Sequence, residues 1–586
     1  MQIAFHTAKF LESLLQKATE ALAFNDFDCQ IKIADPRFGD FQANGALGFA
    51  KKNKMNPREV GQKLLEEIQN SAEFDSSLME LSIAGAGFIN FKFTPKFLMA
   101  YLSQFKSDKD LKQASANLYA GKKIVIDYPS PNTAKQMHVG HLRPMVIGES
   151  IQRLLRFCGA DVTCDNHIGD WGTNFGTLIY GIKTQGYNLD VNNESALEDL
   201  EQLYKLASAK SKEDVEYADA CRNELAKLQA GDEENTKYWN AICKISEVSF
   251  DKMYDALSIT TDLTLGESFY RDKVDRIYTE LTEIGLAKED QGALVVFLED
   301  HPQFKTQPFI IRKKDGASNY ASTDLATILY RVQELKANEL IYVTDARQQD
   351  HFKQLFITTQ KWFDAKGYDY PSLKHVFFGT ILGEDGKAIK TKSGEPIRLR
   401  ALIDEAVKRA LEIVESKNPD MPKEELLEIA TAVGIGALKY ADLCQNRTND
   451  YTFAWSKLLA FEGNTAPYLL YALARIYSIF RKANIDINSN FETEICDFDS
   501  EQEIALARKL ISLPNVFDLS LSELRVHHLC TYIYELAGTF SAFYNTNKVI
   551  VDDPKVMNKR LMLCSRTLRY MEAILQILAI KTLQKM

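Results

Sequence analysis

The sequence has 586 residues, which exceeds the size at which a single hydrophobic core stops growing, so several domains are expected. Hydrophobic residues make up 45% of the chain and charged residues 26%, a balance that excludes a disordered or membrane-embedded protein. The formal net charge of −10 excludes a general nucleic-acid coat protein, because such binding needs a basic surface.

Residues 1–115 form the first predicted domain, a small α+β module. Its hydrophobic pattern predicts an opening amphipathic helix, a short extended segment IKIADPRFGDFQ and a second helix in PREVGQKLLEEIQNS. The segment LSIAGAGFINFKF (81–93) is expected to close the module as a strand.

A strand, a loop, a helix and a second strand follow in close succession. The run KKIVIDY (122–128) is apolar and β-branched, and the helix after it has Pro144 in its first turn and stops at Gly159. The strand ADVTCDNHI comes directly afterwards. This order predicts a right-handed βαβ unit in a parallel, Rossmann-type sheet, with ligands bound at the carboxyl ends of its strands.

Charged helical segments then dominate about residues 183–257, which we expect to be an insertion in the sheet domain. Strand-like segments return at ALVVFLE, PFIIRKK, ELIYVTD and KHVFFGTIL, and GEDGK (383–387) predicts a hairpin turn. Residues from about 400 onward are mostly helical in pattern. We therefore expect a multidomain α/β protein, with a catalytic domain at 116–395, a helical connecting region at 396–455 and an all-α domain at 456–586.

The tetrapeptide HVGH, His138 to His141, lies where the predicted loop meets the helix N-terminus. Such a terminus presents unpaired N–H groups and the positive end of a dipole, so it can bind an anion. The two imidazoles add donors for a triphosphate, and Gly140 leaves room for a close approach of the nucleotide. The alternatives are an accidental pattern or a zinc pair, but the nearby sequence offers no further ligands at metal spacing.

A second basic loop, KAIKTKSGEP, follows the predicted hairpin and contains Lys387, Lys390 and Lys392. A loop of this kind can close over the β- and γ-phosphates of a nucleotide and follow the charge into the leaving pyrophosphate. The alternative is a solvated surface turn. Since neither a Walker A motif nor a GxGxxG pattern occurs, a nucleotide has to be held in another way.

These motifs resemble those of a known enzyme family. HVGH is similar to the HIGH signature of class I aminoacyl-tRNA synthetases, and KTKSG resembles a degenerate form of their KMSKS signature. The surrounding sequence resembles arginyl-tRNA synthetases of the bacterial type over nearly the whole chain. The segments that carry this resemblance are IDYPSPNTAKQMHVGHLR, NHIGDWGTNFG, SNYASTDLA, TDARQQDH, AVGIGALKYADLCQNRTNDYTF and FEGNTAPYLLYALAR.

The resemblance implies an arginine site. It assigns contacts with the amino-acid backbone or the adenylate to Ser130, Asn132 and His138, and it makes Tyr320, Asp324 and Gln348 line the side-chain pocket, with Asp127 as a second carboxylate. A guanidinium does prefer planar carboxylate partners and an aromatic ring. Tyr320 and Asp324 are four residues apart, so a helix would put them on one face, where the alternative is ordinary helix surface.

The second signature departs from the family pattern, because Thr391 replaces the usual hydrophobic residue and only part of the lysine set remains. In members that lack the standard signature, a lysine just upstream of HIGH is thought to compensate, and Lys135 has that position. We therefore expect Lys135 to share the phosphate-binding role with Lys390 and Lys392. The resemblance also implies that arginine activation requires tRNA.

Contacts with RNA are expected at both ends of the chain. Tyr468, Tyr471 and Arg475 follow i, i+3 and i+7, a helical stripe suited to stacking on splayed bases, although a core aromatic stripe is the alternative for Tyr468. By resemblance this region is the helical anticodon-binding domain. The resemblance likewise assigns contacts with the outer corner of the tRNA to Phe88 and Asn90.

The sequence as a whole thus predicts an arginine–tRNA ligase that uses ATP with Mg²⁺, arginine and tRNA(Arg) and acts as a monomer. The nine cysteines never form a CxxC pair, so we expect reduced thiols, no zinc or other metal site and no tightly bound organic cofactor. The start lacks a signal-peptide pattern and no run of about 18 apolar residues occurs, which predicts a cytoplasmic protein without a membrane partner. The alternatives are a smaller HxGH nucleotidyltransferase, a silent RNA-binding paralogue, or a synthetase for another amino acid.

Overall fold

The computed structural model describes residues 4–35, 37–387, 389, 395–489, 491 and 497–586. The chain divides into two compact units. The larger unit comprises residues 119–459 with 577–580, and the smaller unit comprises residues 1–118, 460–576 and 581–586.

A four-stranded parallel sheet forms the centre of the larger unit, in the order β11-β10-β5-β6. Its strands are β5 (Lys123–Asp127), β6 (Asp161–Asp165), β10 (Glu339–Tyr342) and β11 (Ser372–His375). The side chains at 124–126 and at 339–342 are buried, as expected for strands covered on both faces. The strand order reverses between β5 and β10, and in such sheets ligands bind outside the carboxyl ends of the strands at this point.

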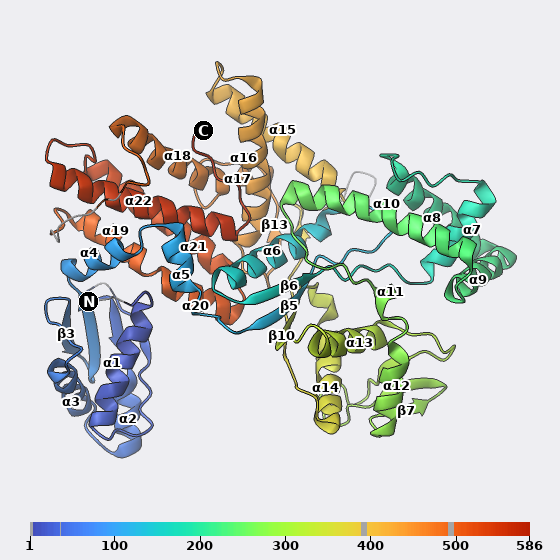
Figure 1. The fold of residues 1–586 in the computed structure, drawn as a ribbon, viewed down its shortest axis with the longest axis horizontal. Coiled ribbons are helices and arrows are strands. Elements are labelled where there is room, and N and C mark those ends of the chain that lie inside the picture. The colour runs from blue at the N-terminus through green and yellow to red at the C-terminus, as the bar shows by residue number, and fades with distance from the viewer. Residues whose placement is uncertain (1–3, 36, 388, 390–394, 490, 492–496) are drawn as a thin grey trace. The chain divides into compact units, whose positions relative to one another are not determined.

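Helices cover both faces of this sheet. Figure 1 shows α6 (Leu142–Phe157) on one side of β5 and β6, with α13 (Tyr320–Gln333) and α14 (Gln349–Lys366) on the other. Apolar side chains of α13 and α14 form one core with β10 and with α12 (Val274–Glu283). The predicted βαβ unit and the parallel sheet are therefore confirmed.

The returning strand-like segments do not all join the parallel sheet. Two of them, ALVVFLE and PFIIRKK, form β8 (Ala293–Val296) and β9 (Phe309–Arg312) of a separate antiparallel sheet. A further strand that the sequence did not predict, β7 (Ala287–Asp290), completes this sheet in the order β7-β8-β9. Just before the turn at 383–387, β12 (Ile381–Leu382) pairs in parallel with the distant β13 (Tyr451–Thr452). The GEDGK turn exists, with the Gly383 amide donating to the Lys387 carbonyl at 2.7 Å, but the strand before it pairs elsewhere.

The remaining elements of the larger unit are helical. The predicted insertion at about 183–257 is a helical cluster that packs on α7. The elements are η1 (Val139–His141), α7 (Asn174–Gln185), α8 (Ala196–Glu213), α9 (Val215–Gln229), α10 (Glu233–Leu257), α11 (Glu267–Tyr270), η2 (Ala346–Gln348), α15 (Leu399–Lys417), α16 (Lys423–Leu443) and α17 (Trp455–Leu458).

The smaller unit combines a four-stranded antiparallel sheet, in the order β1-β2-β4-β3, with helices from both ends of the chain. Its strands are β1 (Ile31–Ile33), β2 (Phe41–Ala43), β3 (Met79–Ala84) and β4 (Phe88–Phe93). Its helices are α1 (Thr7–Ala21), α2 (Gly45–Asn53), α3 (Pro57–Asn70), α4 (Pro95–Gln104), α5 (Asp108–Ser115), α18 (Ala466–Ala483), α19 (Glu501–Ile511), α20 (Leu513–Glu523), α21 (His527–Thr546) and α22 (Pro554–Ile577).

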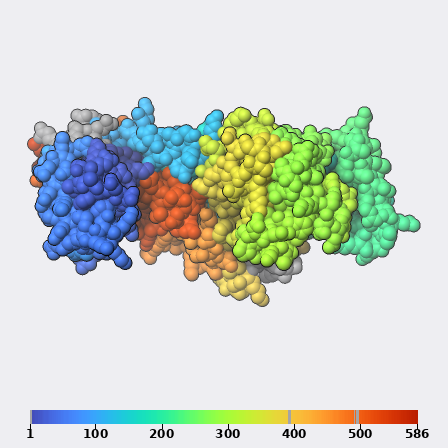
Figure 2. Space-filling view, turned by 90° about the horizontal axis from the view of Figure 1, so that it is seen from below, coloured from blue at the N-terminus to red at the C-terminus, as the bar shows by residue number. Residues whose placement is uncertain are grey.

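In this unit the N-terminal and C-terminal residues pack together, as the adjoining blue and orange-red surfaces in Figure 2 show. Asp40 and Arg508 form an ion pair across the contact at 2.9 Å. The prediction of one closing strand at 81–93 was wrong, because Gly85 and Gly87 adopt positive φ angles of 54° and 95° and turn the chain into the β3-β4 hairpin.

Arg331 of α13 joins the carboxyl ends of β5 and β6. Its Nη2 donates to Asp127 Oδ2 and to Asp165 Oδ2, both at 2.7 Å, and all three side chains are buried. Burial would favour the neutral form of the guanidinium, but the two carboxylates hold the pKa of Arg331 well above its ordinary value. The ends of the two strands are thus connected through one internal cation.

We expect the variant Arg331→Met to destabilise the larger unit by about 3–5 kcal/mol, because it leaves two buried carboxylates without a counter-charge. Thermal unfolding followed by calorimetry should show a melting temperature lower by several degrees. The matched control is Arg347→Met, which removes a guanidinium whose side chain is 88% exposed beside Asp345 and should change stability by less than about 1 kcal/mol. Equal melting temperatures for the two variants would contradict this account.

Candidate functional site

The HVGH residues form a tight turn between the β5 loop and α6. His138 caps the turn: its Nδ1 accepts from the Gly140 amide at 3.1 Å, and its own amide donates to His141 Nδ1 at 3.1 Å. Because Nδ1 of His138 accepts a hydrogen bond, a neutral ring carries its proton on Nε2, which is left as a donor. A Cβ at Gly140 would lie 2.8 Å from His138 Cε1, so any side chain there would displace the ring.

The environment of this turn favours the neutral form of both histidines. Burial, followed by the charge of Arg398, lowers the pKa of His138 below its usual value. Burial together with His138 lowers the pKa of His141 to about 4. The turn therefore offers uncharged donors, and positive charge for a triphosphate has to come from other side chains. The exposed Lys135 is close enough to contribute to both of these pKa shifts.

The segment after the second basic loop lies directly against this turn. The Val139 amide donates to the Ile397 carbonyl at 2.9 Å, and the Leu399 amide donates to the Met137 carbonyl at 3.0 Å. Lys390 and Lys392 lie outside the described residues. The described residues that follow this loop are hydrogen-bonded to the histidine turn.

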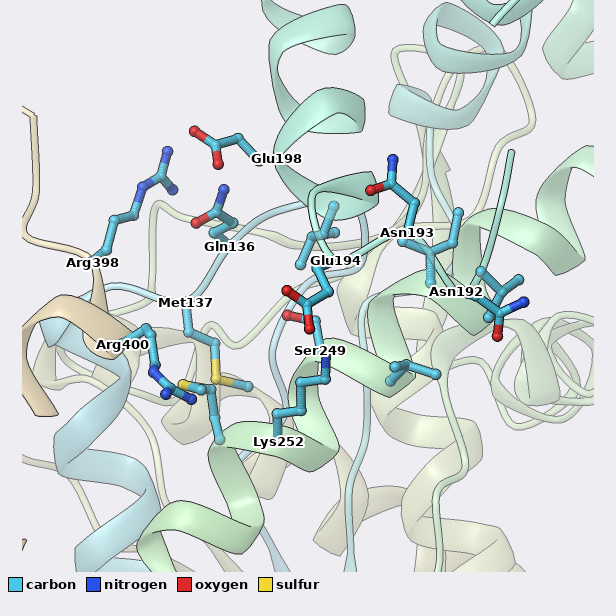
Figure 3. A pocket seen from close by; sticks show the side chains of 15 residues that line it. Gln136, Met137, Asn192, Asn193, Glu194, Glu198, Ser249, Lys252, Arg398 and Arg400 are labelled. Carbon is cyan, nitrogen blue, oxygen red and sulfur yellow. The ribbon is translucent and has the colours of Figure 1, made fainter. Parts of the chain in front are cut away.

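A pocket of about 710 Å³ adjoins the histidine turn, between the turn and the helical insertion. Figure 3 shows Arg398, Arg400 and Lys252 at this pocket together with the acidic side chains of Glu194 and Glu198. The sequence did not predict it. Its mixed charges suit a polar ligand rather than an apolar one.

At the carboxyl end of β5, two of the predicted arginine-binding side chains have internal partners. Asp127 is buried against Arg331, and its other oxygen accepts from the Ser130 hydroxyl at 2.8 Å. Ser130 Oγ in turn accepts from the His167 amide at 3.2 Å. Asn132 is exposed and packs closely on Gly169, where a Cβ would lie 2.1 Å from Asn132 Oδ1. Asn132 is thus the more accessible of these three side chains.

The remaining predicted pocket residues lie on α13 and beside α14. Tyr320 opens α13 and is 69% exposed, and Asp324 follows one turn later on the same helix. Asp324 Oδ2 lies 2.6 Å from His351 Nε2. Gln348 ends η2 and is exposed. The helix that the spacing of Tyr320 and Asp324 required is therefore present.

Glu267, at the start of α11, was not predicted from the sequence. Burial raises the pKa of Glu267 to about 7, with further contributions from the negative charges of Asp324 and Asp170, while His167 acts in the opposite direction. Its amide donates to the Ile168 carbonyl at 3.0 Å, which ties it to the loop after β6. Asp324 and Glu267 thus share a region of excess negative charge, which favours a cationic ligand.

In the smaller unit, α18 and α21 form an aromatic and cationic cluster. The Arg475 guanidinium lies 5.2 Å from the ring of Tyr471 and 5.8 Å from that of Tyr544, and Tyr468 meets Tyr534 edge-on at 5.7 Å. Tyr471 is 45% exposed, so its ring is open to a partner. The sequence missed the two tyrosines of α21 because their contact with α18 is tertiary.

The two predicted contacts on β4 differ in accessibility. Phe88 is half-buried, whereas Asn90 is only 3% exposed and accepts a hydrogen bond from Gln42 Nε2 at 2.7 Å. The Asn90 amide is therefore engaged inside the sheet.

Comparison with known proteins identifies the class. Residues 102–455 match the family described as tRNA synthetases class I (R), catalytic domain. Residues 469–586 match the DALR anticodon binding domain, and residues 9–93 match the arginyl tRNA synthetase N terminal domain. The fold and the histidine turn thus define a class I aminoacyl-tRNA synthetase.

Relatives and solved structures narrow the family. The chain is 43% identical over 556 residues to the arginine–tRNA ligase of Saccharophagus degradans, covering 94% of each chain, and 40% identical over 569 residues to that of Escherichia coli, covering 95% and 96%. Arginyl-tRNA synthetase from Plasmodium falciparum matches all of both chains with 29% identity and a TM-score of 0.82. The chain belongs to the arginyl-tRNA synthetase family. It is an arginine–tRNA ligase, which activates arginine with ATP and transfers it to tRNA.

Proposed function

We propose that the substrate guanidinium binds between Asp324 and Glu267, with Tyr320 and Gln348 completing the pocket. The observation that carries this assignment is that Glu267 is held close enough to Asp324 for their charges to interact. Burial, with a smaller contribution from Asp324, raises the pKa of Glu267 to about 7. A bound guanidinium would supply the missing positive charge in a planar, bidentate form. Asn132 then binds the amino-acid backbone, while Asp127 and Ser130 act mainly by holding the β5 loop in shape.

The ATP site, in this proposal, lies over the histidine turn. His138 and His141 donate to the phosphates as neutral groups beside Gly140, and Lys135, Lys390 and Lys392 bring positive charge. ATP binds as its magnesium complex, and Mg²⁺ usually keeps waters and phosphate oxygens as ligands rather than an all-protein cage. The arginine carboxylate attacks the α-phosphate in line, pyrophosphate leaves, and the terminal ribose hydroxyl of tRNA then attacks the adenylate. Positioning and charge stabilisation carry both steps, without a covalent enzyme intermediate.

For tRNA(Arg), we propose that Tyr468, Tyr471 and Arg475 form a stacking surface for anticodon-loop bases. The exposed ring of Tyr471 beside Arg475 supports this role, because both groups offer planar faces to a base. In the N-terminal module, Phe88 offers a partly exposed ring to the outer corner of the tRNA, and Asn90 supports the same surface from inside the sheet.

The proposal also covers the domain bounds, the oligomeric state, the cellular location and the cofactors of the enzyme. The domains are 1–115, 116–395, 396–455 and 456–586, and the enzyme works in the cytoplasm as a monomer. It needs neither zinc nor a tightly bound organic cofactor, since its cysteines are scattered and unpaired in sequence. Within the described part of the chain, no three His, Cys, Asp or Glu side chains gather as a metal site would require. No helix of that part is both long enough and apolar enough to cross a membrane.

The arginine assignment predicts that Asp324→Ala lowers kcat/KM for arginine by about 10² to 10³-fold or more. Loss of one partner of a hydrogen-bonded charge pair costs about 3–5 kcal/mol, at about 1.4 kcal/mol per tenfold. Pyrophosphate exchange in the presence of tRNA, with arginine and ATP varied separately, should show little change in the KM for ATP. The control Asp350→Ala removes a carboxylate that is 59% exposed on α14 and should cost less than about fivefold. A loss below tenfold for Asp324→Ala, or an equal loss for both substrates, contradicts the assignment.

The RNA assignment predicts that Tyr471→Ala lowers kcat/KM for tRNA by about 5- to 150-fold, because stacking of one base contributes about 1–3 kcal/mol. The KM for arginine should stay unchanged, since Tyr471 belongs to the anticodon-binding domain. Tyr370→Ala, which removes a tyrosine that is 41% exposed in the larger unit, serves as the control and should leave tRNA kinetics at the wild-type level. Unchanged tRNA kinetics in Tyr471→Ala would remove the ring from the RNA surface.

A further inference from the structure

Arg143 lies two residues after His141, near the start of α6, and its side chain is only 1% exposed. We propose that Arg143 is a positioning residue that fixes the histidine turn relative to two other described segments: the one that leads into β12, and η2 with Gln348. It does so through the turn formed by residues 446–450 and through Phe378.

The guanidinium of Arg143 has partners from three parts of the chain. Its Nε lies 3.0 Å from Asp442 Oδ2 in α16, and its Nη1 donates to the Asn449 carbonyl at 3.2 Å. Its guanidinium carbon, Cζ, lies 5.7 Å from the centre of the Phe378 ring and 5.3 Å from the centre of the Tyr451 ring. One planar group therefore touches α16, the 446–450 turn and the segment leading to β12.

The 446–450 turn holds the segment that leads to the second signature. The Gly379 amide donates to the Arg447 carbonyl at 2.9 Å, and the Thr380 amide donates to Asp450 Oδ1 at 2.5 Å. Arg447 Nη1 donates to the Phe377 carbonyl at 2.9 Å. A Cβ at Gly379 would lie 2.6 Å from Asp450 Oδ1, so the segment around Gly379 packs too closely on the 446–450 turn to accept a side chain. A shift of the turn must move the start of β12 with it.

Phe378 extends the connection to the arginine pocket. Its carbonyl accepts from the Ala346 amide at 3.1 Å, in a parallel bridge between Asp345 and Phe378. Ala346 begins the short helix η2 that ends in Gln348. The ring under the Arg143 guanidinium thus belongs to a residue whose backbone holds the loop with a proposed arginine ligand.

The chemistry of the buried Arg143–Asp442 pair favours a positioning role over a purely stabilising one. Burial raises the pKa of Asp442, while Arg143 opposes this shift, as expected for a charge held inside a protein. Apolar residues of similar volume often replace such buried pairs with no loss of stability. An apolar side chain, however, cannot donate to the Asn449 carbonyl or fix the direction of a planar group. Stability and alignment can therefore be separated by experiment.

The decisive variant is the double substitution Arg143→Met with Asp442→Leu, which removes both buried charges together. We expect its melting temperature within about 3 °C of the wild type. The kcat of pyrophosphate exchange, measured with tRNA, should nevertheless fall by about 10- to 100-fold, since small misplacements of reacting groups are costly. The KM values for arginine and for ATP should each change by less than about threefold, because the groups that bind them remain. Arg143→Met alone should lose both stability and rate.

Two further variants keep the proposal testable. Arg156→Met removes another α6 arginine, paired with Asp262 at 2.5 Å on the β6 side, and should keep the wild-type kcat. Arg143→Lys retains a positive charge beside Asp442 but lacks a second arm, so the fold should persist while kcat falls by about tenfold. If the double variant or Arg143→Lys, folded by calorimetry, turns over at the wild-type rate, Arg143 only stabilises the fold. An equal kcat loss in Arg156→Met would also overturn the proposal.

Discussion

The burial of the Arg331 guanidinium between Asp127 and Asp165 is the constraint on which the rest of the catalytic unit depends. Two carboxylates at neighbouring strand ends would repel each other in a low dielectric, and the internal cation makes their proximity favourable. With Asp127 fixed, its second oxygen orients the Ser130 hydroxyl, which in turn receives the His167 amide. The loops after β5 and β6 are thereby shaped before any substrate binds.

This internal arginine also explains how the enzyme distributes its carboxylates. Because Asp127 is already neutralised, it is a poor partner for a second guanidinium, and the substrate must find its counter-charge elsewhere. Asp324 and Glu267 are close enough for their charges to interact, and burial together with the charge of Asp324 raises the pKa of Glu267. One guanidinium therefore organises the scaffold, and the other is the ligand. In the proposed pocket, specificity for arginine would follow from this division, since a neutral side chain would leave Asp324 and Glu267 without a cation.

Much of this organisation could be predicted from the sequence, because it depends on local patterns. The strand, turn and helix around His138 follow from apolar runs and Pro144, and the four-residue spacing of Tyr320 and Asp324 indicated their common helix face. The partner of Asp127 could not be predicted, since Arg331 lies 204 residues away and pairs only when the sheet forms. Glu267 has no local signal either, because its importance comes from charges on distant segments. The β3-β4 hairpin, by contrast, did have a local signal in the sequence. The glycines of AGAG indicate a turn, but the apolar residues on both sides obscured it.

Proton release on arginine binding tests this account most directly. The account assigns Asp127 and Asp165 to the internal Arg331, and Asp324 and Glu267 to the substrate. The pKa of Glu267 is about 7 in the free enzyme, so near that pH a large fraction of Glu267 is protonated. A bound guanidinium favours the carboxylate and must expel the proton, up to about one per site, and arginine affinity must therefore weaken as the pH falls below about 7. The number of protons released per bound arginine can be measured by calorimetric titration of the tRNA-saturated enzyme with arginine. The titrations are made in buffers of different ionisation enthalpy at pH 6.5 to 7.5. We expect release in the wild type and none in Glu267→Gln; an absence of release in the wild type, or the same release in Glu267→Gln, would contradict the account.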